Sequence, residues 1–260
     1  MASAAFFEVP RARVETSAGA VDLPILYYRL DAIYAFWAVD AAAADELLAG
    51  TSLRAVRGPG GKALAGLAFY DYHDTTIGPY HEVGTALAAY PGSAAPVLSW
   101  LDLLVPAARR RLGFYVADLP VSTPIACAAG RELWGLPKFV TDLPFAVDGR
   151  TAACAVADPA GGAPLVSLEG SLGAAVGLPG FDLVLYSQRG ADRLRTSVDV
   201  RGIMSTSLGR GLRVTVKDPS SHPMAARLTR LGVAGRPPLA VQWGRGLSTR
   251  LNAGVVAGRA

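Results

Sequence analysis

The chain has 260 residues, of which 51% are hydrophobic and only 18% are charged. This composition excludes an intrinsically disordered chain, and no run reaches the roughly 18–20 apolar residues that a membrane-spanning helix needs. The formal net charge is +4, from 25 basic and 21 acidic residues, and because the basic residues form no stripe interleaved with aromatics we expect no nucleic-acid partner.

Short apolar runs recur along the chain between turns rich in Gly and Pro, of which there are 29 and 18. Runs of aliphatic, β-branched and aromatic residues bounded by such turns are typical of short strands. So many short strands favour a barrel or a sandwich. The predicted strands are Leu23–Leu30, Tyr34–Val39, Ala63–Tyr72, Glu82–Ala89, Gly113–Asp118, Lys138–Val147, Ala152–Ala157, Leu165–Glu169, Leu183–Gln188, Ser197–Ile203, Leu212–Lys217 and Leu239–Trp243.

Three helices are predicted between these strands. Asp40 can cap the first helix at its N-terminus, and Gly50 ends it. Ser122 or Thr123 can cap the second helix, with Pro124 in its first turn. The third helix has apolar residues at helical spacing. The predicted helices are Ala41–Leu48, Pro124–Leu133 and His222–Leu231.

The remaining segments define the organisation of the chain. Val97–Arg111 fits a strand or a helix, and the sequence leaves both open. No internal repeat or low-complexity linker divides the chain, so we expect one domain. Met1–Val14 carries neither a basic leader nor a long apolar region, so we expect no secretory signal, no membrane association and a cytoplasmic protein.

Several patterns that carry chemistry in other proteins are incomplete here. Arg57–Ala63 is rich in Gly but lacks the spacing of a phosphate-binding loop, so we interpret it as a turn. The His, Asp and Glu residues of 71–82 match no ligand spacing, so we expect no metal, and we expect no cofactor. Cys127 and Cys154 form no CxxC pair and are expected to be buried thiols.

Lysine is rare in this chain: Lys62, Lys138 and Lys217 are the only lysines among 25 basic residues. Unlike Arg, a Lys amine can lose its proton and attack a carbonyl. Lys138 enters a predicted apolar strand, where a charge is costly. It can extend to solvent, or desolvation can leave a neutral amine that forms a Schiff base. In a strand Leu136 and Lys138 share one face and Phe139 takes the other.

Two motifs resemble the acetoacetate decarboxylase family. The stretch GRELWGLPK, Gly130–Lys138, resembles the family's nucleophile motif, in which the lysine after proline forms the Schiff base. The stretch His73–Gly84 resembles the segment that carries an active-site glutamate, here Glu82. The resemblance covers most of the chain and implies a single domain of this kind over residues 1–260. The implied fold is mostly β (α+β), an antiparallel cone-shaped or closed β-barrel with about three helices and an apolar pocket, assembled as a homo-oligomer.

The resemblance also implies roles for the site residues. Lys138 would condense with a small-molecule keto acid or ketone, and Glu82 would move protons. Arg131 and Glu132 are expected to form a buried structural pair near the helix end. The substrate pocket is expected to be lined by Tyr72, Tyr80, Trp134 and Leu136.

Three positions depart from the family pattern. Phe139 stands where the decarboxylases have a second lysine, and Ala68 stands where they have a further glutamate. Val21 lies near the position of an N-terminal arginine. An arginine and an extra glutamate suit a small carboxylate substrate, so their absence predicts a substrate less polar than acetoacetate.

Three functions stay open on the sequence. The first is a decarboxylase-like carbon–carbon lyase that acts through a lysine imine on a larger, less polar β-keto acid. The second is an aldolase or dehydratase that forms the same imine on a 2-oxo acid. The third is a pocket protein that binds an apolar ligand without covalent chemistry.

Overall fold

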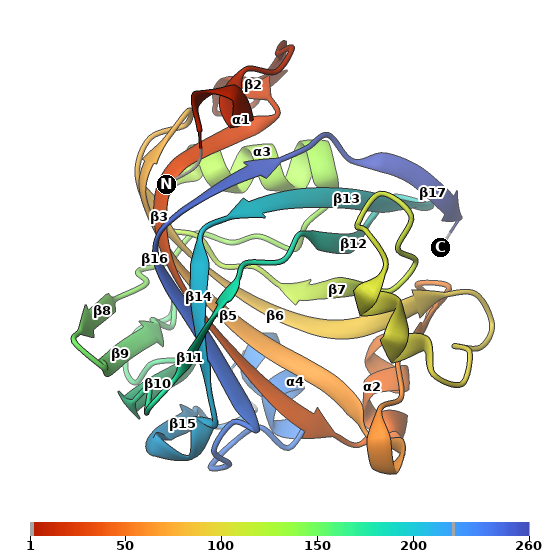
Figure 1. The fold of residues 1–260 in the computed structure, drawn as a ribbon, viewed down its shortest axis with the longest axis vertical. Helices are drawn as coiled ribbons and strands as arrows, with labels where there is room; N and C mark the ends of the chain where they lie inside the picture. Colours follow the sequence, from red (N-terminus) through yellow and green to blue (C-terminus); the bar gives the residue numbers. More distant parts are fainter. Residues whose placement is uncertain (1–2, 220–221, 260) are drawn as a thin grey trace.

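The computed structural model describes residues 3–219 and 222–259. Within them, seven strands close into a barrel in the order β3-β5-β6-β7-β12-β13-β16, and β16 pairs with both β13 and β3 to complete the ring (Figure 1). Neighbours are antiparallel apart from β7 and β12, which are parallel. The predicted mostly β, closed barrel is confirmed. Its strands are β3 (Ile25–Val39), β5 (Ala63–Thr75), β6 (Tyr80–Pro91), β7 (Gly113–Asp118), β12 (Leu183–Arg189), β13 (Asp192–Arg201) and β16 (Ala240–Leu251).

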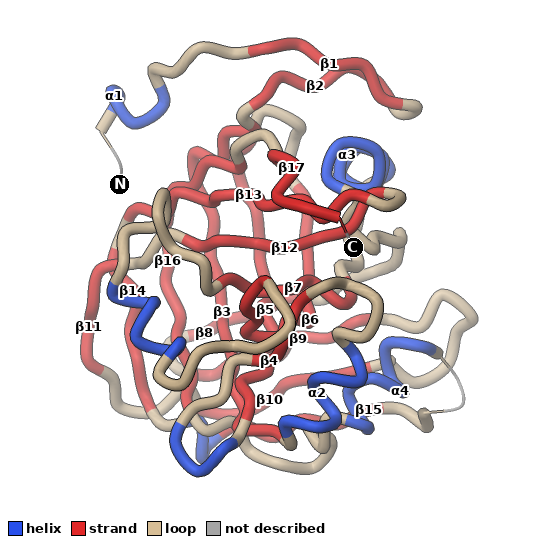
Figure 2. The backbone as a smooth tube through the Cα atoms, turned by 90° about the vertical axis from the view of Figure 1, so that its right-hand side faces the viewer, coloured by secondary structure: helices blue, strands red, loops and turns tan. Residues whose placement is uncertain are grey.

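The other strands extend the barrel or pack beside it. β1 (Ala12–Thr16) and β2 (Gly19–Leu23) form a hairpin at the same end of the barrel as helix α3 (Figure 2). A separate four-stranded sheet lies against the barrel wall. Its strands are β8 (Phe145–Asp148), β9 (Thr151–Val156), β10 (Val166–Ser171) and β15 (Leu212–Val216). The remaining strands are β4 (Leu53–Ala55), β11 (Val176–Pro179), β14 (Ile203–Ser207) and β17 (Val255–Arg259).

The three predicted helices are present. Asp40 caps the first helix by accepting a hydrogen bond from the Ala42 amide at 2.9 Å. His222 caps the third by accepting one from the Met224 amide at 3.1 Å. A single-turn helix, α1, was not predicted. The α-helices of the described residues are α1 (Ala4–Phe7), α2 (Ala41–Leu47), α3 (Pro124–Trp134) and α4 (Pro223–Arg230); within that part of the chain no helix is long and apolar enough to cross a membrane.

The predicted strand Lys138–Val147 is wrong over its first seven residues. The strand begins at Phe145, and the preceding residues contact the barrel through a bridge between Val140 and Val121. Pro137 and Pro144 lack the N–H that a central strand must donate. Lys138 therefore lies in an extended connection between α3 and β8.

Other boundaries also differ. The predicted strands Leu23–Leu30 and Tyr34–Val39 are parts of one strand, β3, which begins only at Ile25 because Leu23 ends β2. The pairing of β3 with β5 shifts register around the exposed Arg29. The predicted strand Ser197–Ile203 spans the end of β13 and the start of β14. The segment Val97–Arg111, for which the sequence left strand and helix undecided, contains a short 3₁₀ helix, Ser99–Leu104. Polar residues at bulges and glycine corners make such boundaries hard to place from the sequence.

Side chains alternate across the barrel wall. Along β5, Leu67 and Phe69 face outward into a core shared with the four-stranded sheet and with Leu228 of α4. Ala68 and Tyr70 face the barrel interior. The wall is therefore stabilised from outside, which leaves its inner face free to carry the site.

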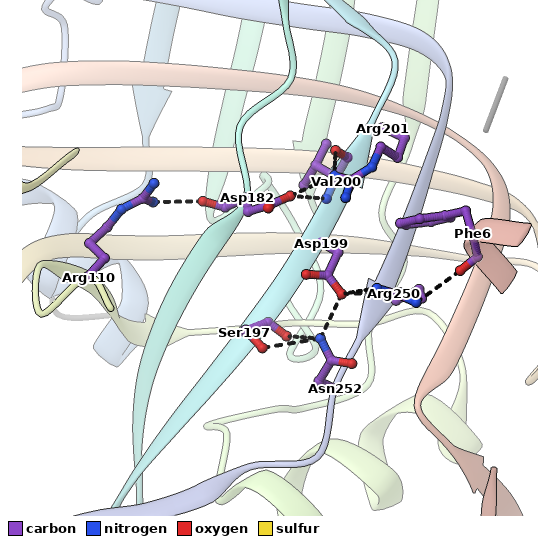
Figure 3. A network of polar contacts seen from close by, with 9 residues as sticks. All are labelled: Phe6, Arg110, Asp182, Ser197, Asp199, Val200, Arg201, Arg250 and Asn252. Atoms are coloured by element: carbon purple, nitrogen blue, oxygen red, sulfur yellow. Dashed lines mark hydrogen bonds and ion pairs between the residues drawn. The ribbon is translucent and has the colours of Figure 1, made fainter. Parts of the chain in front are cut away.

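A polar network stabilises the seam where β13 meets β16 (Figure 3). Asp199 accepts hydrogen bonds from the Arg250 guanidinium at 2.9 and 3.1 Å and from the Asn252 amide at 2.9 Å. Arg250 also donates to the Phe6 carbonyl at 3.0 Å, with its guanidinium 4.5 Å from the centre of the Phe6 ring. The same network therefore holds α1 against the closed barrel.

We expect Asp199→Ala to lower the free energy of unfolding by about 1.5–3 kcal/mol, the usual contribution of hydrogen bonds to charged groups. The side chains of Asp199 and Arg250 are only about one-fifth exposed, so solvent replaces the lost contacts poorly. Urea unfolding measures the change. Glu15→Ala is the control, because Glu15 is exposed and lies 3.8 Å from Arg13, and it should change stability by less than about 0.5 kcal/mol. Equal effects of the two substitutions would contradict the role of the seam.

Candidate active site

The amine of Lys138 and the carboxylate of Glu82 meet inside the barrel. Lys138 Nζ lies 2.6 Å from Glu82 Oε2, and the two residues are 7% and 8% exposed. The Tyr72 hydroxyl donates to Glu82 Oε1 at 3.2 Å. A buried pair of this kind is stable only when the groups are close and their remaining hydrogen-bonding positions are satisfied. Lys138, which the sequence indicated as a candidate nucleophile, is thus buried beside an acid.

The end of helix α3 directs Lys138 into the barrel. Gly135 adopts a left-handed conformation, with φ +60°, and Leu136 N donates to the Gly130 carbonyl at 3.0 Å, so the chain reverses after the helix. The Lys138 side chain then crosses the helix at Gly130. A Cβ atom at Gly130 would lie 2.3 Å from Lys138 Cε. The glycine is therefore required for this close approach.

Strand alternation places Glu82. On β6 His81 faces outward and Glu82 faces inward, opposite Tyr70 of β5 in the ladder. On the outer face, His81 Nε2 and His73 Nδ1 lie 3.2 and 3.5 Å from Asp71 Oδ1. Among the described residues, no group of three or more His, Cys, Asp or Glu side chains has a metal-binding arrangement.

Tyrosines surround the ion pair. The Tyr72 ring stacks on Tyr70 with centroids 5.3 Å apart, and the hydroxyls of Tyr27 and Tyr80 are 3.0 Å apart. Burial, followed by the charge of Glu82, raises the pKa of Tyr72 well above its usual value, and burial raises the pKa of Tyr34 to about 12. These hydroxyls stay protonated and act as neutral donors. Tyr27, Tyr34 and Tyr70 were missed in the sequence, although the alternation of their strands could have indicated them.

A cavity of about 90 Å³ adjoins the pair. Among its described lining residues, Lys138 and Glu82 alone carry charge; the others are aliphatic, small or tyrosine side chains and Thr249. The site therefore offers one amine, one carboxyl group and neutral hydroxyls in an apolar enclosure.

Two of the four residues that were expected to line the pocket do so. Tyr72 and Leu136 line the cavity. Tyr80 does not line it; its ring lies beneath the amine, with Lys138 Nζ 5.9 Å from the ring centre. The expectation that Trp134 lines the pocket is wrong, because its ring is in the core and its indole N–H donates to the Asn252 carbonyl at 3.0 Å. From the sequence alone, a large aromatic residue near the site fits a position in the core and a position in the pocket equally well.

The expected buried pair of Arg131 and Glu132 is also wrong. Both residues are exposed, on the side of α3 that faces away from the barrel. Glu132 accepts hydrogen bonds from the backbone amide and the hydroxyl of Ser17 in the β1–β2 turn. Glu132 therefore holds the hairpin to the helix.

Phe139 faces away from the amine. It packs against the outer core, and its ring centre lies 5.1 Å from that of His222. Leu136 lines the same cavity as Lys138. The predicted division of faces is therefore observed, although the segment is not a strand. Cys127 and Cys154 are buried free thiols, as expected.

Comparisons with known proteins place this geometry in context. A family model described as acetoacetate decarboxylase (ADC) matches residues 9–188. The acetoacetate decarboxylase of Legionella pneumophila subsp. pneumophila str. Philadelphia 1 has a TM-score of 0.65 and 14% identity over 97% of this chain and 92% of its own. The comparison with curated proteins finds no significant match.

Two further solved structures share the fold. The enduracididine biosynthesis enzyme MppR, complexed with pyruvate, has a TM-score of 0.60 and 13% identity over 90% of each chain. An acetoacetate decarboxylase-like enzyme from Sphingomonas wittichii RW1 has a TM-score of 0.59 and 14% identity over 92% of this chain and 94% of its own. At such identities the likeness establishes the fold alone.

We expect Gly130→Ala to displace the Lys138 amine from Glu82 while the protein stays folded. The new Cβ meets a flexible side chain, and alanine favours the helix by about 0.5–1 kcal/mol, so the free energy of unfolding should change by less than about 1 kcal/mol. A crystal structure of the variant measures the Nζ–Oε2 distance, and thermal unfolding measures stability.

Gly135→Ala is the matched control for Gly130→Ala. Its Cβ would lie 2.3 Å from the Gln188 carbonyl oxygen, and its φ is +60°, so the obstacle is backbone and the loss should be about 1–3 kcal/mol. An Nζ–Oε2 contact that stays at 2.6 Å in Gly130→Ala would contradict the steric argument.

Proposed function

The chain belongs to the acetoacetate decarboxylase family, and from that premise we propose that it is a Schiff-base enzyme acting on a keto acid, a decarboxylase-like carbon–carbon lyase whose substrate is less polar than acetoacetate. The family membership predicted from the sequence is confirmed. The observation that carries the proposal is the 2.6 Å contact of the Lys138 amine with Glu82 inside a cavity whose other described lining residues are uncharged.

The first step is imine formation. An ammonium group is no nucleophile, so Lys138 must first give a proton to Glu82, which lies within hydrogen-bond reach. Transfer along the 2.6 Å contact produces a neutral amine and a neutral acid. The amine attacks the ketone carbon, Glu82 returns the proton to the carbinolamine oxygen, and water leaves. The product is an iminium ion on Lys138.

The second step is loss of CO₂. The electrons of the bond to the carboxylate move into the iminium, which yields CO₂ and a neutral enamine. Among the described lining residues no arginine holds the carboxylate. An apolar enclosure stabilises the anion poorly and the neutral enamine well, so the enclosure itself favours this step. Protonation of the enamine carbon and hydrolysis then release the ketone and free Lys138.

A second candidate uses the same imine without loss of CO₂. It is favoured by two MppR structures, one complexed with pyruvate and one with the condensation product of pyruvate and imidazole 4-carboxaldehyde. In that case an enamine formed on Lys138 from a 2-oxo acid would attack an aldehyde. The third candidate, non-covalent binding of an apolar ligand, needs no reactive amine.

We further propose a single family domain over residues 1–260, assembled as a homo-oligomer in the cytoplasm. The shared core of the barrel and the four-stranded sheet supports one domain. Exposed apolar side chains that follow one another in one segment, among them Val97, Leu98 and Leu104, support assembly. Two buried unpaired thiols are typical of a reducing compartment.

We expect borohydride to trap a keto acid or ketone on Lys138 and not on the other lysines. Lys62 is exposed and lies 3.8 Å from Asp40, whereas Lys217 lies 2.7 Å from Asp158. Peptide mass spectrometry locates the adduct, and Lys138→Met is the control that should give none. Equal labelling of all three lysines would contradict the proposal that Lys138 is unusually reactive. Measuring CO₂ release separates the lyase from the aldolase.

Glu82→Gln should slow turnover by about 10²–10⁴-fold, the usual contribution of a general acid–base group. Imine trapping should survive in part, because the amine remains. Tyr72→Phe is the comparison, since it removes one hydrogen bond to Glu82 and keeps the ring; its loss should be about tenfold. Steady-state kinetics of CO₂ release measure both. A near-normal turnover rate in Glu82→Gln would mean that Glu82 lines the cavity without transferring protons.

A further inference from the structure

A second cavity, of about 60 Å³, lies in the barrel next to the one at Lys138. The two cavities share part of their wall, so they adjoin. The shared residues are Tyr34, Ala68, Tyr70, Ala86, Leu183 and Leu185. The second cavity adds Phe36, Phe114 and Phe181, and none of its described lining residues carries charge. Its position extends the site away from the ion pair along the interior of the barrel.

Small side chains on β5 and β6 produce this space. The inward-facing pairs run from Tyr70 opposite Glu82, through Ala68 opposite Gly84, to Gly66 opposite Ala86. Each step of two residues moves about 6.6 Å along a strand, so small side chains line roughly 13 Å of wall beyond the ion pair. The other strand faces of the lumen carry rings and aliphatic groups that enclose the gap. The interior of the barrel is therefore narrower at Tyr70 and wider beyond it.

Ala68 lies at the junction of the two cavities. It pairs with Tyr34 on one side and with Gly84 on the other, and it lines both cavities. A larger side chain at this position would project into the connection. Apolar cavities without polar groups stay dry and bind apolar guests. The size of residue 68 thus decides whether a ligand at Lys138 can extend further.

We propose that the two cavities bind one ligand, with its carbonyl at Lys138 and an unbranched alkyl tail in the second cavity. The substrate class is then a 3-oxo acid with a short alkyl tail that places about two to three carbons in the second cavity, because an apolar cavity of about 150 Å³ holds the six carbons of benzene and the second cavity is about 60 Å³. Ala68 is the specificity-determining residue. The carbonyl end rests on the proposed function, whereas the tail subsite does not.

Binding of 2-alkanones from acetone to 2-heptanone tests the tail subsite by calorimetry in Lys138→Met, which forms no imine. The dissociation constant should fall about fourfold for each added methylene. In Lys138→Met with Ala68→Leu, this gain should disappear beyond 2-butanone. Ala68→Ser in the same background is the matched control, because it preserves the space and should keep the dependence on chain length. Thermal unfolding checks that each variant is folded.

Two results would overturn the tail subsite. One is an affinity of Lys138→Met for 2-alkanones that does not depend on chain length. This measurement keeps Ala68, so it holds whether or not the Ala68 variants fold. The other is the same dependence in the Ala68→Leu and Ala68→Ser proteins. Borohydride trapping of the same ketones on the unmodified protein tests the imine separately. Trapping at Lys138 without length dependence refutes the tail alone, whereas length-dependent binding without trapping supports the tail and refutes the imine.

Discussion

An amine cannot stay charged inside an apolar barrel unless an acid lies within hydrogen-bond reach. The 2.6 Å contact of Lys138 with Glu82 satisfies this constraint, and the surrounding structure is arranged to permit it. Helix α3 has a glycine where the lysine stem crosses it. Strand β6 turns its glutamate inward. The tyrosine hydroxyl at Glu82 supplies a neutral donor that the buried carboxylate would otherwise lack.

The constraint also explains why the barrel is stabilised from outside. A lumen that contains a cavity and an ion pair contributes less apolar packing than a filled interior. The outer faces of β3, β5 and β6 compensate by packing against the four-stranded sheet, α2 and α4. Helix α3 and the β1–β2 hairpin instead lie at one end of the barrel (Figures 1 and 2), and the Lys138 side chain crosses α3 at Gly130. Stability and the candidate site therefore occupy opposite faces of the same strands.

The sequence predicted the barrel, the helices and the two residues of the ion pair, which lie 56 positions apart. Periodicity and capping are local, so they located most elements, and the family motifs located Lys138 and Glu82. Local signals failed where tertiary contacts decide. Trp134 fits a core or a pocket equally well until the position of α3 is known. The proline-flanked segment after Lys138 looked like a strand because it contains apolar residues, of which Phe139 and Leu143 pack in the outer core without forming a ladder. The connection between two cavities at Ala68 depends on the barrel register, which no local pattern contains.

Phe139 stands where the decarboxylases have a second cation, and its orientation keeps that position away from the amine. With a substrate carboxylate present, the cavity would hold two carboxylates and one amine, an uncompensated negative charge in an apolar site. Imine formation passes the Glu82 proton to the departing water, so the iminium then lies beside the Glu82 carboxylate and the substrate carboxylate. Loss of CO₂ turns the iminium and the substrate carboxylate into a neutral enamine, which removes two charges from the enclosure and leaves Glu82 as a carboxylate; water supplies the proton for the enamine carbon. A lysine at position 139 would point away from the amine, as Phe139 does where it packs against the outer core beside His222, so its ammonium would act on these charges only from a longer distance.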